Sequence, residues 1–322
     1  MKHRLRTTTI IILLFVIAQV FALYSFSLNL KPNTSVNIVG NVSENITTYN
    51  NMNTILGDRP VMSPFDAMIY VLFGIAFATI LLLIIIRSKK SKIWHGWYFI
   101  SITLAMSITL GVWLNKITNN LASAAVIAIL LSVLLSYLKY NKNNAIFHNF
   151  TEILIYTGIA ILFAPLLNLA MTFVLLVMIS VYDMFSVWKT KHMITMAKFL
   201  TSTSNFTGFA VPNKGISLKP SEPDENHKES DFKDRSNIAI LGNGDVSFPM
   251  WFVLVFFKGF LNNTKNFWLS FNFSMIIILA VAASLTLLFA YSKKGKFYPA
   301  MPFLTAGIAA GYALTILAGI VF

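Results

Sequence analysis

Long apolar runs alternate with short polar segments along the whole chain. Each run has about 20 residues, the length that an α-helix needs to cross the roughly 30 Å hydrocarbon core of a bilayer. The fifth and sixth runs are nearly continuous, and Pro165 and Asn168 mark the turn between them. The pattern predicts an all-α, polytopic membrane protein with nine membrane-spanning helices, over residues 9–30, 66–86, 97–115, 121–138, 148–166, 168–188, 238–257, 267–291 and 299–321.

The basic N-terminus and the first apolar run have the layout of a secretory signal peptide. The run has about 20 residues, however, which is longer than the apolar core of a signal peptide. It is also not followed by a clear small-x-small cleavage site. We therefore expect this segment to remain in the protein as the first span.

Lysine and arginine cluster in every second loop, and this asymmetry predicts the orientation in the membrane. Cytoplasmic loops of multi-pass proteins carry the positive excess. With nine spans, 20 of the 25 Lys and Arg fall on the side of the N-terminus. The other side receives only Lys31, Arg59, Lys116, Lys258 and Lys265. The N-terminus is therefore expected in the cytoplasm and the C-terminus outside.

The composition supports a bilayer environment and excludes several chemistries. Hydrophobic residues make up 56% of the 322 residues and charged residues only 11%, against about 25% charged in soluble domains. The net charge of +13 comes from short clusters between apolar runs and forms no basic face, so nucleic acid is not an expected partner. The lack of cysteine excludes disulfides, a thiolate nucleophile and a cysteine-based metal site.

Two of the segments outside the spans flank the membrane. Residues 31–64 form an Asn-rich loop with glycan acceptor sequons at Asn33, Asn41 and Asn45, and a plain polar loop is an equal interpretation. Residues 190–210 are moderately apolar and predict an interfacial helix that continues the sixth span.

A third segment divides the chain. Residues 214–236 are charged and interrupted by proline, which predicts a flexible cytoplasmic loop. The expected organisation is therefore an N-terminal part, residues 1–213, with spans one to six and the interfacial extension, then this loop, and then residues 237–322 with spans seven to nine.

Two aspartates stand out, because an ionised carboxylate inside hydrocarbon costs several kcal/mol. The other Asp and Glu residues lie in predicted loops or near span ends, including Asp66 and Glu152 at the start of their spans. Asp183 lies six residues before Lys189, roughly 9 Å inside the cytoplasmic boundary. Asp245 lies seven residues after the predicted start of its span. The two carboxylates are thus expected at one shallow depth on consecutive helices, where they can face each other.

Two facing carboxylates have the chemistry of an aspartic protease. Two like charges a few Å apart repel, so the pair shares one proton and offers a base and an acid together. The ionised member takes a proton from a held water while the protonated member donates one to the peptide carbonyl. Paired aspartates also bind ions in transporters, so pairing alone leaves both functions open.

Other hydrolytic and cofactor chemistries lack their motifs. HExxH is absent, which excludes the common zinc protease motif, and no phosphate-binding loop is present. The five histidines lie in predicted loops or at span edges: His3, His95, His148, His192 and His227. No span interior therefore offers the histidine that an intramembrane serine protease needs. We expect neither a metal nor a cofactor.

Three short motifs surround the two aspartates. Tyr182 precedes Asp183, Asp245 ends Gly-Asn-Gly-Asp over residues 242–245, and Pro-Ala-Met-Pro over residues 299–302 opens the last span. Together they resemble the YD, GxGD and PALP motifs of the presenilin and signal peptide peptidase family of intramembrane aspartyl proteases. They occur in that family's order and on its sixth, seventh and ninth helices, so we expect a microbial, archaeal member.

The resemblance implies that Asp183 and Asp245 are a catalytic pair that cuts within transmembrane helices of signal-peptide remnants or single-pass proteins. It also implies residues that bind substrate or shape the active site: Tyr182, Gly242, Asn243, Gly244, Pro299, Ala300, Met301 and Pro302. Asn243 and Met301 stand where the family commonly has leucine, which bears on substrate choice more than on activity.

Two rival functions are weighed against the protease. A prepilin or preflagellin peptidase also resembles a GxGD protease, but it would not explain Tyr182-Asp183 or the motif at Pro299. A cation- or proton-coupled transporter would use the two buried aspartates to bind ions, yet these lie toward one face of the membrane instead of the midplane.

The expected partners follow from the protease interpretation. They are the lipid bilayer and proteins with transmembrane helices as substrates. Obligate partner subunits are not expected, because the loop between the sixth and seventh spans is short compared with that of presenilin, and a homo-oligomer stays open. The expected location is the plasma membrane, as a multi-pass protein.

Overall fold

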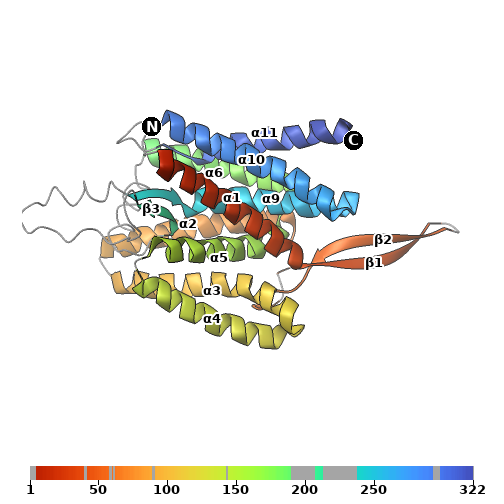
Figure 1. Cartoon of the computed structure of the whole chain (residues 1–322), viewed down its shortest axis with the longest axis horizontal. Helices are drawn as coiled ribbons and strands as arrows, with labels where there is room; N and C mark the ends of the chain where they lie inside the picture. The colour runs from red at the N-terminus through yellow and green to blue at the C-terminus, as the bar shows by residue number, and fades with distance from the viewer. Residues whose placement is uncertain are drawn as a thin grey trace, which may run out of the picture.

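The computed structural model describes residues 5–39, 42–57, 60, 62–88, 91–142, 144–189, 207–212, 238–292 and 298–321. Within these ranges nine helices are long and apolar enough to cross a membrane, which confirms the nine predicted spans. They are α1 (Leu5–Leu28), α2 (Pro64–Ser88), α3 (Ser91–Thr118), α4 (Leu121–Asn141), α5 (Ala145–Phe163), α6 (Leu169–Trp188), α9 (Asn243–Thr264), α10 (Phe267–Tyr291) and α11 (Met301–Val321). α1 begins and α11 ends at opposite ends of the bundle (Figure 1).

Asparagine caps explain where several helices begin. Asn168 Oδ1 accepts a 2.8 Å hydrogen bond from Met171 N–H and starts α6. Between α5 and α6 the chain makes one short 3₁₀ turn, Ala164–Leu166, with Pro165 at its start. Asn120, Asn144 and Asn266 cap α4, α5 and α10 in the same way. These side chains satisfy N–H groups that have no partner inside the helix, so the apolar run can turn back into the membrane.

The segment after α1 is a β-hairpin, although a polar loop is predicted there. β1 (Leu30–Val39) pairs antiparallel with β2 (Val42–Asn51), and together they form the long hairpin. Both strands contain β-branched threonine, valine and isoleucine, which favour strands, among polar residues. Asn33 lies exposed on β1, whereas Asn41 and the side chain of Asn45 lie outside the described residues.

A second, short hairpin precedes α9 and corrects two predictions. β3 (Gly208–Pro212) pairs antiparallel with β4 (Ile238–Gly242). The seventh span therefore starts at Asn243 and not at Ile238, because the first five residues of that apolar run pair as a strand. The interfacial helix predicted for residues 190–210 is wrong for its last three residues, since they belong to β3; residues 190–206 and the loop 214–236 lie outside the described residues.

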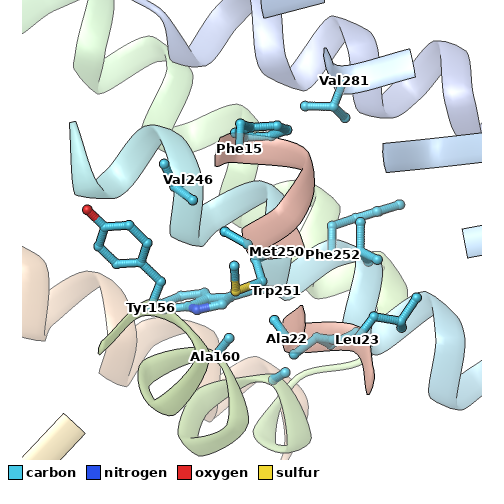
Figure 2. Packing of buried hydrophobic residues seen from close by; sticks show 14 of the residues in the cluster. Phe15, Ala22, Leu23, Tyr156, Ala160, Val246, Met250, Trp251, Phe252 and Val281 are labelled. Atoms are coloured by element: carbon cyan, nitrogen blue, oxygen red, sulfur yellow. The ribbon is translucent and has the colours of Figure 1, made fainter. Parts of the chain in front are cut away.

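α9 lies at the centre of the bundle. It contacts α1, α5, α6, α10 and α11. About two thirds of its membrane-spanning residues are buried inside the bundle. Figure 2 shows Val246 and Met250 of α9 packed between Phe15 of α1 and Tyr156 of α5. All four side chains are fully buried. The helix that carries Asp245 is thus the most enclosed of the nine spanning helices in the described residues.

α2 and α4 lie at the periphery. Only about a fifth of the membrane-spanning residues of each helix are buried inside the bundle. Large apolar side chains such as Phe73 of α2 and Leu130 of α4 are 70% and 66% exposed. In a bilayer these faces contact lipid, where an exposed apolar side chain costs nothing.

Candidate active site

Asp183 lies on the buried side of α6. Leu176, Ser180 and Asp183 recur at helical spacing, and all three are buried. Asp183 is 5% exposed, whereas the preceding Tyr182 is 40% exposed. α6 therefore turns its carboxylate into the bundle and leaves much of the tyrosine ring at the surface.

The start of α11 reaches this carboxylate. Met301 N–H donates a 3.2 Å hydrogen bond to Asp183 Oδ2. The first N–H groups of a helix have no partner within the helix, and they form its positive end, so a carboxylate is favourable there. One turn away, the hydroxyl oxygens of Ser180 and Thr305 are 2.7 Å apart. Two polar contacts thus hold α6 against α11 beside Asp183.

The rest of the proline motif lies around this contact. Pro299 is buried and precedes α11, while Ala300 and Pro302 are half-buried on either side of Met301. A proline at the second helical position has no N–H to satisfy and suits a helix start. The structure therefore brings the Pro299–Pro302 segment to Asp183, as the sequence predicts for a residue set around one site.

Asp245 is the third residue of α9. β4 ends at Gly242 and α9 begins at Asn243, so strand and helix meet without a connecting loop. A Cβ atom on Gly242 would lie 3.2 Å from Asp245 Oδ2, which is tighter than most real Cβ contacts. Glycine at position 242 therefore lets the carboxylate lie against the end of the strand, where the Gly242 backbone hydrogen-bonds it.

The two remaining residues of the second motif shape the first turn of α9. Asn243 Oδ1 accepts a 2.7 Å hydrogen bond from Ser247 Oγ, within the same helix. A Cβ atom on Gly244 would lie 3.1 Å from the ring of Phe248. Both residues therefore act on the helix start.

The structure brings the two predicted aspartates together. α6 packs against α9, and Asp183 and Asp245 lie close enough for their charges to interact. Asp183 is buried and Asp245 is partly exposed. Among the described residues neither carboxylate forms an ion pair, and no group of three His, Asp or Glu side chains is arranged to hold a metal ion. The arrangement places two carboxyl groups on neighbouring helices of one site.

A buried polar cluster near this site is not evident from the sequence. Glu152 is placed at the edge of its span by the apolar pattern, but it is fully buried. Lys139 of α4 supplies its counter-charge, with Nζ 2.6 Å from Glu152 Oε1. His148, one turn earlier on α5, is also buried. The spacing of His148 and Glu152 puts both on one helix face, but the partner that makes burial tolerable comes from another helix.

The chain is similar to a known protein family and to solved structures. A family model described as signal-peptide peptidase, presenilin aspartyl protease matches residues 12–321. The chain is similar to a solved structure of a presenilin family intramembrane aspartate protease in space group C222, with 17% identity and a TM-score of 0.58 over 97% of this chain and 99% of that chain. A P2 crystal form of a presenilin family intramembrane aspartate protease matches at 17% identity and a TM-score of 0.55, over 98% of each chain. At this identity the two matches show a shared fold.

No curated protein sequence matches the chain significantly. Neither the family model nor the two structures support the cation- or proton-coupled transporter.

Proposed function

Because the chain belongs to the signal-peptide peptidase and presenilin family of aspartyl proteases, we propose that Asp183 and Asp245 are its catalytic pair. Family and fold make the chain a multi-pass, membrane-embedded protease that acts on transmembrane substrates. The observation that carries the assignment is geometric: α6, α9 and α11 pack together, Asp183 accepts a hydrogen bond from the start of α11, and Asp245 lies in the first turn of α9.

The proposed reaction uses one proton shared by the pair. The ionised carboxyl takes a proton from a water held between the two, and the water oxygen attacks the carbonyl carbon. The protonated carboxyl donates its proton to the carbonyl oxygen. The tetrahedral intermediate then collapses: a proton returns to the amide nitrogen, the C–N bond breaks, and a carboxylic acid and an amine leave. The shared proton belongs to the pair and is assigned to neither residue.

Two groups of residues would receive the substrate. The extended backbone at Pro299 and Ala300, before Met301 and Pro302, would pair with an unwound substrate strand, since a transmembrane helix must open before its amides can be cut. Gly242 and Gly244 remove side chains beside Asp245 and leave room for that strand. The proposed residues that bind substrate or shape the active site are Tyr182, Gly242, Asn243, Gly244, Pro299, Ala300, Met301 and Pro302.

The wider organisation belongs to the same proposal. Residues 1–213 and 237–322 each supply one catalytic aspartate, and the loop 214–236 joins them. The substrates are signal-peptide remnants or single-pass proteins, and the protease works without obligate partner subunits and without a metal or cofactor. The N-terminus faces the cytoplasm, the C-terminus faces outside, and the plasma membrane is the location.

The test compares the detergent-purified protein with Asp183→Asn and Asp245→Asn variants on a labelled single-span substrate, with products identified by mass. Each variant should lose cleavage by about 10³-fold or more, because each carboxyl has a separate proton role. Asp66→Asn is a matched control: Asp66 also lies in the first turn of a helix, but it is exposed and accepts its hydrogen bond from Ser63. Cleavage retained by either of these variants would refute the assignment of Asp183 and Asp245 as the catalytic pair.

Two further readouts complete this experiment. A peptide isostere with a hydroxyl in place of the scissile carbonyl mimics the tetrahedral intermediate, and the wild type should bind it. A transporter has no reason to do so. The shallow site also predicts product masses that place the cut near the cytoplasmic end of the substrate helix, and a cut at the outer end would contradict the proposed orientation.

A further inference from the structure

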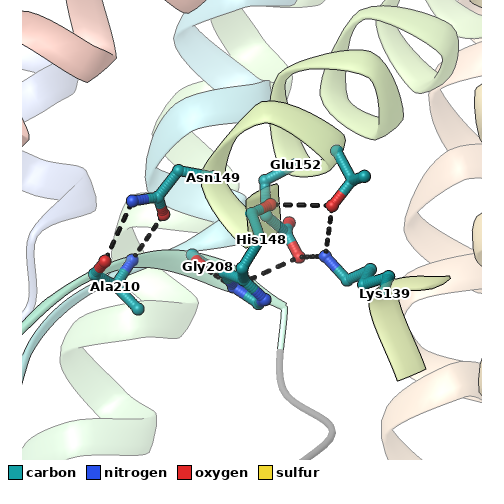
Figure 3. Close-up of polar contacts among 7 residues, drawn as sticks. Lys139, His148, Asn149, Glu152, Gly208 and Ala210 are labelled. Carbon is teal, nitrogen blue, oxygen red and sulfur yellow. Dashed lines mark hydrogen bonds and ion pairs between the residues drawn. The ribbon is translucent and has the colours of Figure 1, made fainter. Parts of the chain in front are cut away.

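The edge of β3 that faces away from β4 is bound by side chains of α5. Asn149 Nδ2 donates a 2.9 Å hydrogen bond to Ala210 C=O, and Asn149 Oδ1 accepts a 2.9 Å hydrogen bond from Ala210 N–H. Figure 3 shows both bonds. Asn149 is 7% exposed and Ala210 is fully buried. One amide therefore satisfies both backbone groups of a strand residue that water does not reach.

His148 holds the same edge at the residue opposite Gly242. Its Nε2 lies 2.9 Å from Gly208 C=O, and since a carbonyl only accepts, this nitrogen is the donor. Gly208 is the cross-strand partner of Gly242. Gly242 is the last residue of β4 and contacts Asp245. The histidine thus acts directly across the hairpin from the residue that supports the second aspartate.

A buried ion pair lies beside this histidine. Glu152 Oε1 lies 3.7 Å from His148 Nε2 and 2.6 Å from Lys139 Nζ. Thr151 Oγ1 accepts a further hydrogen bond from Lys139, at 3.1 Å. Figure 3 shows Lys139 on the side of His148 away from Asn149. The cluster therefore ties α4, α5 and β3 together with directional contacts.

The short hairpin needs such support. A two-stranded hairpin alone is at best marginally stable, and these strands have five residues each. Phe209 packs edge-on against Tyr156 of α5, with ring centroids 5.3 Å apart, but apolar packing does not select one register. The hydrogen bonds to Gly208 and Ala210 do, because a shift by one residue would leave buried backbone groups unpaired.

From these contacts we propose that Asn149 and His148 are positioning residues, which hold β3 to α5 and thereby keep Asp245 in reach of Asp183. The proposal rests on the proposed function of the two aspartates. Asn149 and His148 bind the backbone of β3, so their effect on the carboxylates passes through β3, β4 and Gly242. The hydrogen bonds from Asn149 to Ala210 and from His148 to Gly208 are two clamps on β3. Loss of either clamp lets the start of α9 move while the helix bundle stays folded.

The experiment measures cleavage kinetics and backbone hydrogen exchange on the full-length protein. Asn149→Leu keeps the size and removes both hydrogen bonds. Exchange in the 207–212 segment should rise and kcat should fall, each by about tenfold or more, while KM changes by less than about twofold. His148→Gln keeps a donor near the same place, whereas His148→Leu does not. The glutamine variant should therefore keep most of the activity that the leucine variant loses.

Asn262→Leu is the matched control, because Asn262 binds both backbone groups of Tyr49 in β2, at the opposite end of the bundle. It should raise exchange in β2 and leave kcat unchanged. Faster β3 exchange with unchanged kcat would overturn the proposal, and so would a kcat loss that only matches the loss of folded protein. Exchange needs no substrate, so a wild type that fails to cleave would count against the proposed function and not against the clamp. If Asn149→Leu does not fold, the two His148 variants decide.

Discussion

The long and the short hairpin are held to the bundle by the same chemistry but serve different ends. Asn262 binds both backbone groups of Tyr49 in β2, at 2.6 and 3.5 Å. Asn149 binds both backbone groups of Ala210 in β3, at 2.9 Å each. Asn262 is half-buried and its strand emerges from the bundle (Figure 1). Asn149 of α5 is buried, and so is most of β3, the strand that it binds.

This difference in burial decides how much each asparagine matters. Where water reaches the backbone, it replaces a lost hydrogen bond at little cost, so a clamp there contributes about 1 kcal/mol or less. Where water is excluded, the lost partner leaves buried polar groups unsatisfied, at about 1–3 kcal/mol for each group. The short hairpin also leads directly into the helix of Asp245, whereas the long hairpin leads to α2.

The largest expected effect lies in the ion pair beside the short hairpin. Lys139→Met leaves the Glu152 carboxylate buried without its counter-charge, and this should cost about 3–5 kcal/mol of stability. Lys116→Met, in the last turn of α3, changes an exposed lysine. This variant should cost less than about 1 kcal/mol of stability. Thermal unfolding in detergent measures both.

A double variant sharpens the same prediction. Lys139→Met combined with Glu152→Leu removes both charges and should recover most of the lost stability, because a buried ion pair can be replaced by apolar groups at little cost. A double variant as unstable as the single one would show that packing at Lys139, and not the charge, accounts for the loss.

A glycine of the short hairpin can be compared with Gly57, which lies in a turn after the long hairpin. Gly208 and Gly57 both have positive φ, +144° and +105°, so alanine at either position carries strain of about 1–3 kcal/mol. At Gly208 the new Cβ would also lie 2.6 Å from Leu241 C=O of β4, whereas at Gly57 nothing lies within 4 Å. Cleavage should fall about tenfold in Gly208→Ala and stay within about twofold of wild type in Gly57→Ala. Equal losses in both would show that strain at a glycine, and not the link from β3 to Asp245, reduces cleavage.

The smallest effect is expected on the exposed face of the long hairpin. The hydroxyls of Thr34 and Thr47 lie 3.4 Å apart across β1 and β2 and are exposed to solvent. Thr34→Ala should change the unfolding free energy by less than about 0.5 kcal/mol and leave cleavage unchanged. A clear loss of cleavage would assign the long hairpin a part in handling substrate.

The helical spans are predictable because their signal is local. A run of about 20 apolar residues is enough to form a spanning helix whatever lies beside it. Pro165 and Asn168 mark the break between α5 and α6, and the structure has a 3₁₀ turn and a helix cap there. The predicted grouping of Asp183, Asp245 and the Pro299 motif also agrees with the arrangement, while their catalytic roles and the orientation of the termini stay predictions.

The strands and the polar cluster are not predictable from the same pattern. Residues 238–242 are apolar enough to extend the seventh span, and only pairing with 208–212 makes them a strand. Glu152 has the position of a span-edge carboxylate, and only Lys139 on another helix makes its burial tolerable. In both cases the partner that determines the structure lies too far away in the sequence to affect the local pattern of apolar and polar residues.

The sequence by itself thus determined nine membrane helices and the two aspartates placed within them, because hydrophobic length and the cost of a buried charge depend on the residues themselves. The tertiary structure alone decided that Met301 N–H meets Asp183 and that Asn149 holds the strand leading to Asp245. These contacts join residues of different helices and strands, and their energy exists only once the bundle excludes water from the groups involved.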